Sequence, residues 1–411
     1  MPGFSISLSG LTASSTALSA IANNLANLNT VGYKDSVVQF RDLFYQTIGS
    51  SGSGDPIQLG AGVAVGATPS NFTQGSIDPT GVATDVAINN DGFFVVQRDG
   101  VTSYTRAGNF TVNENDLLVT AQGQEVLGYP AVNGTISTAE GLSALELGAG
   151  TISPPNPTTT VQMRTNLNAS SAVGATFPAT ITVYDSLGGE HVLTFNFTKT
   201  ASNAWSYAIT VPAADVGKTG NPVSVGTGNL QFDTNGNLTT PAADINGITV
   251  SGFADGASNL SFTWKLYDGT TGLLTQVASA SSTSSTQQDG SGSGALANFS
   301  IGSDGMITGT FSNGKTQVLG QMALATFANV QGLLRTGQNC FASTLASGQA
   351  VVGAPGTGGR GTLAGGALEL SNVDIAKEFS ALIVAQRGFE ANARAITTFD
   401  EITQATINLK R

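Results

Sequence analysis

The sequence predicts a mainly β protein with an α-helix at each end of the chain and with one β domain inserted into another. Three observations support this. The stretch 1–33 carries no charged side chain and repeats leucine every seven residues. The last part of the chain holds a second apolar stripe at helical spacing, without proline after Pro355. Between them, short β-rich runs alternate with Gly and Asn turns.

The composition narrows the class of protein before any motif is considered. Of the 411 residues, 10% are charged and 40% hydrophobic, and the 52 glycines suit many tight turns. The net charge of -11 argues against a nucleic-acid partner, because such proteins cluster Lys and Arg. The lone Cys340 and the lone His191 exclude an intramolecular disulfide and a His-rich metal site. We therefore expect no catalytic, cofactor-binding or metal-binding residues.

The N-terminal stretch predicts an amphipathic helix. Leu11, Leu18 and Leu25 recur every seven residues, and Ile21 and Leu28 form a companion row three residues after the second and third leucine. This is the a/d pattern with which helices pair.

The C-terminal stretch predicts the partner helix. Ile375, Phe379, Leu382, Phe389 and Ile396 follow one face at spacings of three, four and seven residues. Because both ends carry such a row, we expect the two helices to pair as a coiled coil.

The sequence also suggests where these helices begin and end. Ser9 or Ser14 is the expected N-cap of the first helix, Gly32 the residue just past its end, and Ser371 or Asn372 the N-cap of the second. The charges near the ends of the second helix suit its dipole: Asp374 and Glu378 at the start, Lys410 and Arg411 at the end.

The sequence of the middle of the chain predicts strands and turns. The run 86–88, a turn at 90–92 and the run 93–96 predict a β-hairpin. Further strands are expected at 181–184, 192–197, 207–211, 260–266 and 322–327.

Low-complexity stretches suggest the domain limits. We expect a stiff linker at 153–157, a Ser/Thr/Gly loop or linker at 279–294, and flexible zones at 49–54 and 353–366. The resulting division is as follows: 1–33 and 367–411 as a helical polymer-core domain, 34–75 as a connecting segment, 76–152 and 295–366 as an outer β domain, and 153–294 as the inserted β domain. A fragment of about 76–366 should then fold as a β-rich monomer.

Three motifs could carry chemistry, and each has a simpler explanation. The G-x-G-G-x-G string in 355–361 is not followed by a helix start, so a hinge is favoured over a nucleotide site. The run 233–237 lacks the distant bidentate Glu of a calcium loop and suits an Asn-Gly turn. His191 could pair with Asp185 in a hydrolase triad, but a cross-strand contact is the ordinary explanation.

Several longer segments resemble the rod and hook family of axial proteins of the bacterial flagellum. They are NNLANLNTVGYK (23–34), DVAINNDGFFVV (85–96), YTRAGNFTVN (104–113), SNGKTQVLGQMALATFANVQGL (312–333) and SNVDIAKEFSALIVAQRGFEANARAITTFDEI (371–402). The stretch 183–200 is also similar to the hook members of this family. The inserted domain favours the hook branch, because distal-rod members are shorter and lack a large insertion.

The resemblance implies a self-assembling structural subunit of a curved, flexible hook that transmits torque from rod to filament. The ten apolar positions named for the two helices would then be polymer contacts, and 34–75 would brace neighbouring subunits. The implied partners are other copies of the chain, the rod and hook–filament junction proteins, the hook cap during assembly and the flagellar type III export apparatus. The alternatives are a distal-rod subunit or a secreted β-rich adhesin.

The implied location is extracellular, in the hook and basal body of the flagellum. No Lys or Arg precedes Lys34, so a cleavable signal peptide is not expected, and the exported chain should keep its first residues. No segment reaches the ~20 apolar residues that are needed to span a bilayer, so membrane insertion is not expected.

Overall fold

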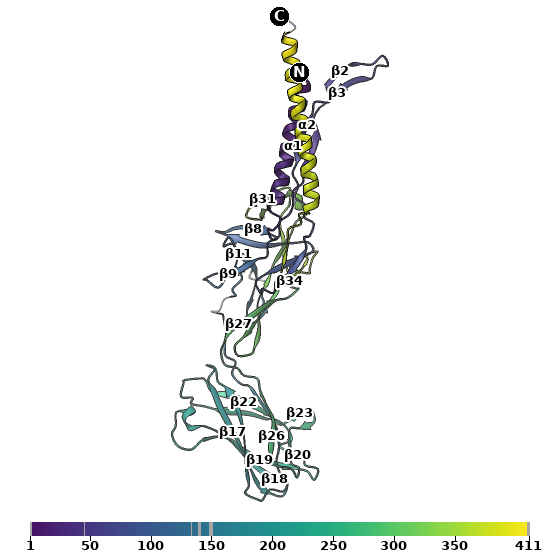
Figure 1. Ribbon diagram of the computed structural model, residues 1–411. Helices are drawn as coiled ribbons and strands as arrows, with labels where there is room; N and C mark the ends of the chain where they lie inside the picture. Colours follow the sequence, from purple (N-terminus) through teal and green to yellow (C-terminus); the bar gives the residue numbers. More distant parts are fainter. Residues whose placement is uncertain (1, 45, 133, 139–140, 148–150, 409–411) are drawn as a thin grey trace. The chain divides into compact units, whose positions relative to one another are not determined.

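The computed structural model describes residues 2–44, 46–132, 134–138, 141–147 and 151–408 (Figure 1). Lys410 and Arg411, which were expected to complement a helix dipole, lie outside these residues. The chain divides into two compact units. Unit 1 comprises Met1–Gly148, Phe299–Gly309 and Gln317–Arg411, and unit 2 comprises Ala149–Asn298 and Thr310–Thr316.

Two long helices belong to unit 1: α1 (Pro2–Ala26) and α2 (Ile375–Asn408). They pack side by side, as the purple and yellow ribbons of Figure 1 show. The prediction of paired terminal helices on a mainly β protein is therefore confirmed.

The predicted ends of α1 were wrong. The helix begins at Pro2, whose fixed φ suits a first helical turn, so Ser9 and Ser14 lie in its interior. Ser9 Oγ donates to the Ile6 carbonyl at 2.7 Å instead of capping. The helix ends at Ala26, well before Gly32, because the Asn side chains that follow compete for backbone groups. Gly32 has a φ of 65° and donates its N–H to the Glu369 carbonyl at 2.7 Å.

The predicted cap of α2 was also wrong by a few residues. Asp374 caps the helix, because its Oδ1 accepts the N–H groups of Ala376 (2.8 Å) and Lys377 (3.1 Å). Asn372 instead accepts the Asp35 N–H at 2.8 Å, and Ser371 accepts the Val373 N–H at 3.4 Å.

The strands of unit 1 come from both flanks of the insertion. They are β1 (Gln39–Asp42), β2 (Gln46–Ser50), β3 (Pro56–Leu59), β4 (Val63–Ala67), β5 (Ile77–Pro79), β6 (Val86–Asn89), β7 (Phe93–Arg98), β8 (Val101–Thr105), β9 (Phe110–Val112), β10 (Leu118–Thr120), β11 (Glu125–Val132), β12 (Thr135–Ile136), β13 (Ser143–Ala144), β30 (Leu324–Thr326), β31 (Leu334–Gly337), β32 (Cys340–Ala342), β33 (Val351–Gly353), β34 (Thr362–Gly365) and β35 (Ala367–Glu369), with the short 3-10 helix η2 (Val330–Gly332). Strands β28 (Met306–Phe311) and β29 (Thr316–Met322) contain residues of both units. In the order β29-β11-β7-β8-β32-β31, three strands of the first flank, β11, β7 and β8, lie between strands of the second flank within one sheet.

The predicted hairpin of 86–96 was wrong, although both of its strands exist. β6 pairs with β34, in the register Val86↔Gly365 to Asn89↔Thr362, and β7 pairs with β8, β11 and β30. The turn itself is present, with Asn90 at a φ of 74°. Both strands are almost fully buried, and the long-range partners cover more apolar surface than a two-stranded hairpin could.

Unit 2 is a sandwich of one antiparallel sheet and one mixed sheet, in which β15 pairs in parallel with β22 and β25. Its elements are β14 (Ile152–Ser153), β15 (Thr160–Asn166), β16 (Thr176–Tyr184), β17 (Glu190–Ala201), β18 (Ala204–Val211), η1 (Ala213–Val216), β19 (Val223–Phe232), β20 (Leu238–Thr240), β21 (Ile245–Val250), β22 (Leu260–Lys265), β23 (Tyr267–Asp268), β24 (Thr271–Gly272), β25 (Leu274–Thr275) and β26 (Ser282–Gln288), with β27 (Gly294–Ile301) shared with unit 1. One sheet has the order β16-β17-β18-β19-β20, and the other β21-β22-β15-β25 with β26 on β15. β17 and β18 alternate buried and more exposed residues, so that one face enters the core.

The two sheets of unit 2 share one apolar core. Trp264 from one sheet packs on Phe195 and Tyr207 from the other, with ring centroids 4.8 and 5.1 Å apart. Trp205 donates its indole N–H to Gln276 Oε1 at 2.8 Å. Four of the five predicted single strands, 181–184, 192–197, 207–211 and 260–266, correspond to β16, β17, β18 and β22 of this unit. The fifth, 322–327, lies in unit 1 and is divided between the end of β29 and β30.

Three segments expected to be loops contain strands. The Ser/Thr tract 279–294 contains β26, an exposed edge strand that pairs with β15. The zone 49–54 is the tip of the β2–β3 hairpin, and 353–366 contains β34. Thr-rich runs are β-formers once a partner strand is available, which composition alone does not reveal. The G-x-G-G-x-G string leads into a strand, and Arg360 Nε donates to the Ala354 carbonyl at 3.0 Å.

Candidate assembly interface

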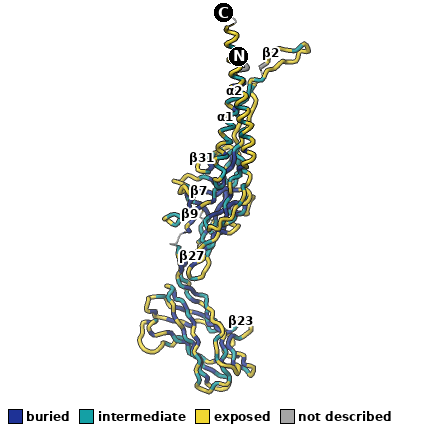
Figure 2. The backbone as a smooth tube through the Cα atoms, in the orientation of Figure 1, coloured by how far each residue is buried: buried dark blue, intermediate teal, exposed yellow. Residues whose placement is uncertain are grey.

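Large apolar side chains lie on the solvent-facing sides of α1 and α2. On α2, Phe379 is 51% exposed, Ile383 58% and Val384 71%. Figure 2 shows that much of this helix consists of exposed residues, drawn in yellow. The other apolar side chains of this kind are Phe4, Leu8, Ile375, Ile402 and Ile407. So many aliphatic and aromatic groups in water along one helix pair mark a surface that another molecule covers.

The seam between the helices is built from small residues. A Cβ at Gly10 would stand 2.7 Å from Asn392 Oδ1, and one at Gly388 would stand 3.4 Å from Ser14 Oγ. The helices therefore approach closely along this stretch, and larger side chains point elsewhere. The bulkier apolar side chains therefore lie beside this close contact, where they are half-buried, or on the solvent-facing sides of the helices.

The ten predicted interface residues fall into three groups. Ile375 and Phe379 are exposed on α2. Leu28 lies beyond the end of α1, so its predicted helical position was wrong. The remaining seven are half-buried along the helix pair: Leu11, Leu18, Ile21, Leu25, Leu382, Phe389 and Ile396.

Sequence reasoning missed part of the exposed surface. Ile383 and Val384 directly follow the predicted Leu382, and Phe4 and Leu8 continue the α1 pattern toward the N-terminus. An a/d template admits only a narrow seam, whereas a helix that contacts several neighbours needs a wider apolar stripe. Scoring the positions beside the seam would have found Leu8, Ile383 and Val384, and extending the leucine row by one heptad would have found Phe4.

A second apolar surface lies on the β2–β3 hairpin. Phe44, just before β2, is 94% exposed, and Ile48 in β2 is 63% exposed. Ile57 and Leu59 in β3 are also exposed. A two-stranded hairpin with three such groups on its strands and Phe44 just before them gains stability from a covering partner, because an isolated hairpin is marginal in water.

A buried ion network joins the helix-bearing ends of the chain to the β body of unit 1. Glu369 Oε1 accepts Lys34 Nζ at 2.7 Å, and Glu369 Oε2 accepts Arg106 Nε at 2.9 Å. Gly75 donates its N–H to the same carboxylate at 2.8 Å, and Lys34 Nζ also donates to the Thr73 carbonyl at 2.7 Å. The three charged side chains are at most 4% exposed.

The charges in this network keep Glu369 ionised. Burial alone would raise the pKa of Glu369, but Arg106 and Lys34 outweigh it and hold that pKa below its ordinary value. Burial lowers the pKa of Lys34, and the Glu369 carboxylate opposes that shift. The network fixes the chain just after α1 and just before α2 to the same β body.

A second polar junction joins the two helices directly. Asn24 Nδ2 donates to Glu378 Oε1 at 3.2 Å and to the Ser36 carbonyl at 2.9 Å, while Asn24 Oδ1 accepts the Ser36 N–H at 3.0 Å. Burial raises the pKa of Glu378, and nearby Asp35 adds to the rise, while the Asn24 hydrogen bond opposes it. The buried ends of both helices are thus held by specific polar contacts.

Among the residues that the structure describes, one helix has the length and composition of a membrane span. The helical segment Phe4–Ala26 contains an 18-residue window with a mean hydropathy of 1.2, and 11% of that window is buried. The expectation that no segment is long and apolar enough was therefore wrong by this measure. Length and composition are the whole of that finding.

Family models place the chain among the axial proteins of the bacterial flagellum. The flagella basal body rod protein model matches residues 4–34, and the flagellar basal body rod FlgEFG protein C-terminal model matches 364–409. The flagellar hook protein FlgE/F/G D1 domain model matches 87–166, and the flagellar basal body protein FlaE D2 domain model matches 146–291. Together these models cover both helices and much of both units.

Full-length relatives give the family. The flagellar hook protein FlgE of Salmonella typhimurium (strain LT2) is 37% identical over 99% of this chain and 100% of its own length. That of Escherichia coli (strain K12) is 36% identical over 99% and 100%, and that of Treponema pallidum is 34% identical over 98% of each chain. The chain belongs to the flagellar hook protein family, as the resemblance predicted, and is a structural protein of the hook. A crystal structure of Helicobacter pylori flagellar hook protein FlgE2 aligns at a TM-score of 0.49 with 15% identity, covering 71% of this chain and 100% of that one.

Proposed function

We propose that this chain polymerises through its terminal helices into the tube of the flagellar hook, with copies of the chain covering one another's exposed apolar stripes. The observation that carries the proposal is the set of exposed apolar side chains on α2, among which Phe379 and Val384 lie in the first third of the helix. Burying a side chain of this size stabilises by about 1.5–3 kcal/mol, and every copy would contribute several. The ten predicted positions belong to this interface as part of the same proposal.

The β2–β3 hairpin is proposed to brace a neighbouring copy. It lies within the connecting segment 34–75, and its apolar side chains, Phe44 and Ile48 above all, are exposed. The proposed division of labour is a helical core from 1–33 and 367–411, an outer β domain from 76–152 and 295–366, and an inserted β domain from 153–294. The outer layers would repack as the tube bends and carries torque from rod to filament.

The polar junctions support a mechanical role. Torque passes between a helical core and outer domains only if the two are firmly joined, and the Lys34–Glu369–Arg106 network provides a buried joint at that point. The proposed role is structural and not catalytic. The proposed partners are other copies of the chain, the rod and junction proteins at the two ends of the hook, the hook cap and the type III export apparatus.

Electron microscopy of the purified chain tests the proposal. We expect tubes of uniform diameter whose reconstruction places α1 and α2 innermost, with Phe379 and Val384 against neighbouring copies. Polymers held together through unit 2, with the helices free in solvent, would contradict it. Straight rods that do not bend would favour a rod-like role instead.

The extracellular location is tested separately. Immunogold labelling of intact cells with antibody against unit 2 should decorate the base of each flagellum outside the outer surface. Label confined to the cytoplasm of flagellated cells would contradict export.

A further inference from the structure

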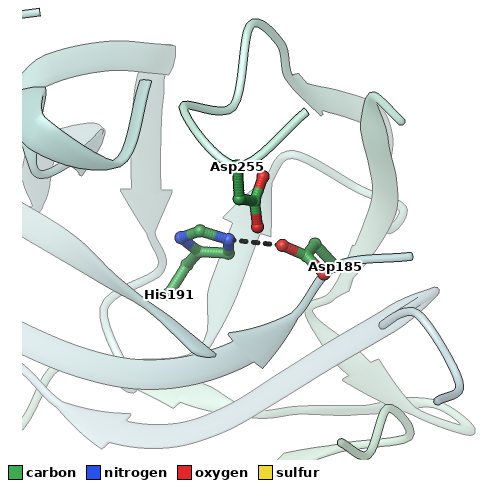
Figure 3. Close-up of side chains that lie close together, drawn as sticks. All are labelled: Asp185, His191 and Asp255. Atoms are coloured by element: carbon green, nitrogen blue, oxygen red, sulfur yellow. Dashed lines mark hydrogen bonds and ion pairs between the residues drawn. The ribbon is translucent and has the colours of Figure 1, made fainter. Parts of the chain in front are cut away.

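A compact group of titratable side chains lies in unit 2, apart from the helices. Asp185, His191 and Asp255 each offer one ligand atom, and these atoms all lie within 4.8 Å of one another (Figure 3). His191 Nε2 is 2.9 Å from Asp185 Oδ2. Asp185 is fully buried, His191 is 7% exposed, and Asp255 opens to solvent. The group is therefore held by the fold and remains reachable from outside.

The two carboxylates present one oxygen each toward this point. Asp185 Oδ1 accepts the N–H groups of Leu187 (2.7 Å) and Gly189 (2.9 Å), and Asp255 Oδ1 accepts the Ala257 N–H (3.0 Å). The Oδ2 atoms are turned toward Gly189, where an added Cβ would lie 2.6 Å from Asp185 and 3.1 Å from Asp255. The turn thus uses a glycine at the place where a side chain would fill the site.

Contacts to Asp215 and Phe253 orient the His191 imidazole. His191 Nδ1 lies 3.0 Å from Asp215 Oδ2, and the ring stacks on Phe253 with centroids 4.3 Å apart. When Nδ1 carries the proton and donates it to Asp215, Nε2 keeps its lone pair. A carboxylate on the far nitrogen is the usual partner of a metal-binding histidine, because it fixes the tautomer and raises ligand basicity.

The charge of the group favours a cation. Three carboxylates surround one imidazole, so even a protonated His191 leaves two negative charges uncompensated. A divalent ion that replaces the proton on Nε2 removes one more negative charge than the proton does. An imidazole nitrogen with carboxylate oxygens suits Zn²⁺ and its transition-metal neighbours better than Mg²⁺ or Ca²⁺, which prefer oxygen ligands alone.

We propose that unit 2 binds a divalent transition-metal ion of the Zn²⁺ class through His191 Nε2, Asp185 Oδ2 and the Asp255 carboxylate, with Asp215 as the positioning residue. Water would complete the coordination. This departs from the expectation that the chain has no metal ligands, which considered a His-rich site and a calcium loop at 233–237.

The site would join the two sheets of the sandwich. Asp185 follows β16 and His191 lies in β17, which belong to one sheet, whereas Asp255 lies in the loop between β21 and β22 of the other. The contacts already made across this place are the Phe253 ring on His191 and hydrogen bonds such as Ser258 N–H to Ser186 Oγ at 2.9 Å. A metal ion here would fasten the end of the sandwich, and binding would weaken as pH falls because protons compete for the ligands.

The single histidine of the chain makes the test specific. ZnCl₂ is titrated into the full-length protein while the imidazole nitrogens are followed by ¹⁵N NMR. We expect one saturable site, with a large shift of Nε2 and a protonated Nδ1. A ring that stays protonated on both nitrogens at saturating Zn²⁺ would overturn the proposal and leave a proton-bridged carboxylate pair. Equal binding of Mg²⁺ would overturn the assigned metal class.

Variants separate ligands from surroundings. Asp255→Asn, at an exposed position that should not disturb folding, is expected to weaken Zn²⁺ binding at least tenfold, and Asp215→Asn by about 10–100-fold. Asp268→Asn, an exposed carboxylate in the same unit, is the matched control and should bind as the unmodified chain does. Unchanged affinity in Asp255→Asn, or Zn²⁺ binding of the same strength in His191→Gln, would overturn the proposal.

Discussion

The helix pair and the sandwich of unit 2 keep their apolar side chains in opposite places. In the sandwich, Phe195, Ile209 and Trp264 are fully buried, and the alternating strands leave mostly polar groups outside. In the helix pair, the seam is made of small and polar residues such as Gly10, while Val384 is 71% exposed. The sandwich therefore buries its apolar surface within one chain, whereas the helices leave it for other molecules.

This difference predicts that the two regions respond to different experiments. Substitutions in the sandwich core should change the stability of a single chain. Substitutions on the outer face of α2 should change assembly and leave the chain folded. Both tryptophans of the chain lie in unit 2, so their fluorescence reports on the sandwich alone.

The largest effect is expected from Val384→Asp or Phe379→Asp. Each places a carboxylate in a surface that neighbouring copies cover, at a cost of several kcal/mol per subunit. A cost of about 4 kcal/mol corresponds to about a thousandfold rise in the concentration needed for polymerisation. Sedimentation measures polymer, and thermal melting measures the monomer.

Lys218→Asp, at an exposed position in unit 2, is the control and should polymerise normally. Leu25→Asp and Phe389→Asp should also block assembly, but their half-buried positions within the helix pair will lower helix stability as well. Normal filaments from Val384→Asp and Phe379→Asp together would show that the outer face of α2 is not an interface.

The next effect is expected from Glu369→Gln. It leaves Arg106 and Lys34 buried without a carboxylate, which costs about 3–5 kcal/mol. Unit 1 should melt earlier by circular dichroism, while tryptophan fluorescence of unit 2 is unchanged. Glu390→Gln, in an exposed pair with Arg387, should cost about 0.5 kcal/mol or less; an equal loss in both variants would refute the special role of the network.

The same network gives a pH dependence. The pKa of Glu369 is depressed in the folded chain, so its stabilisation is present above the ordinary value of 4.5 and is lost as pH falls through the lower folded value. Unit 1 of the unmodified chain should therefore lose stability in acid below pH 4.5. Glu369→Gln should show a flatter acid profile for unit 1.

The fragment 76–366 is affected for the same reason. It retains Arg106 but lacks both Lys34 and Glu369. We expect its unit 2 part to fold as in the full chain and its unit 1 part to be weakened, whereas a fragment of 34–370 restores the network. Tryptophan fluorescence and circular dichroism of the two fragments distinguish these outcomes, and equal melting of both would contradict the expectation.

A smaller effect is expected from Ile209→Val in the sandwich core. Removing one buried methylene costs about 0.5–1.5 kcal/mol, or a few degrees in the melting of a unit of this size. Tryptophan fluorescence measures it, and polymerisation at low temperature should be unchanged. A loss of assembly without a loss of stability would show that unit 2 contributes more to cohesion than the comparison implies.

The smallest effect is expected from Glu378→Gln. The pKa of Glu378 is raised in the folded chain, so its favourable contribution is present below the unfolded pKa and is lost as pH rises through the folded value. The unmodified chain should gain helix stability as the pH falls from 7 toward the ordinary value of 4.5, and Glu378→Gln should lose most of that pH dependence. Helix melting at the two pH values measures it; the same gain in both proteins would contradict this assignment.

Three elements show which structural features the sequence predicted and which it did not. The leucine row of 1–33 predicted α1, but not its end at Ala26, because the Asn side chains that end it act through local hydrogen bonds and not through periodicity. The run 86–96 predicted two strands but the wrong pairing, because β34 lies far along the chain. The Ser/Thr tract holding β26 was missed, since its polar residues become a strand only beside β15.

The sequence by itself determined the kind of protein, because periodicity, low charge and long family motifs are properties of the chain and need no partner. It also determined two helical ends around a β body. Only the tertiary structure decided the strand partners, the buried carboxylate network at Glu369 and the meeting of His191 with Asp255. Each of these joins residues that are distant in sequence, and although matching apolar rows could predict that the end helices pair, the pattern along a strand or loop does not specify its distant partner. The exposed face of α2 depends on both sequence and tertiary structure. The sequence gives its apolar residues, but only the fold shows that α1 does not cover Phe379, Ile383 and Val384.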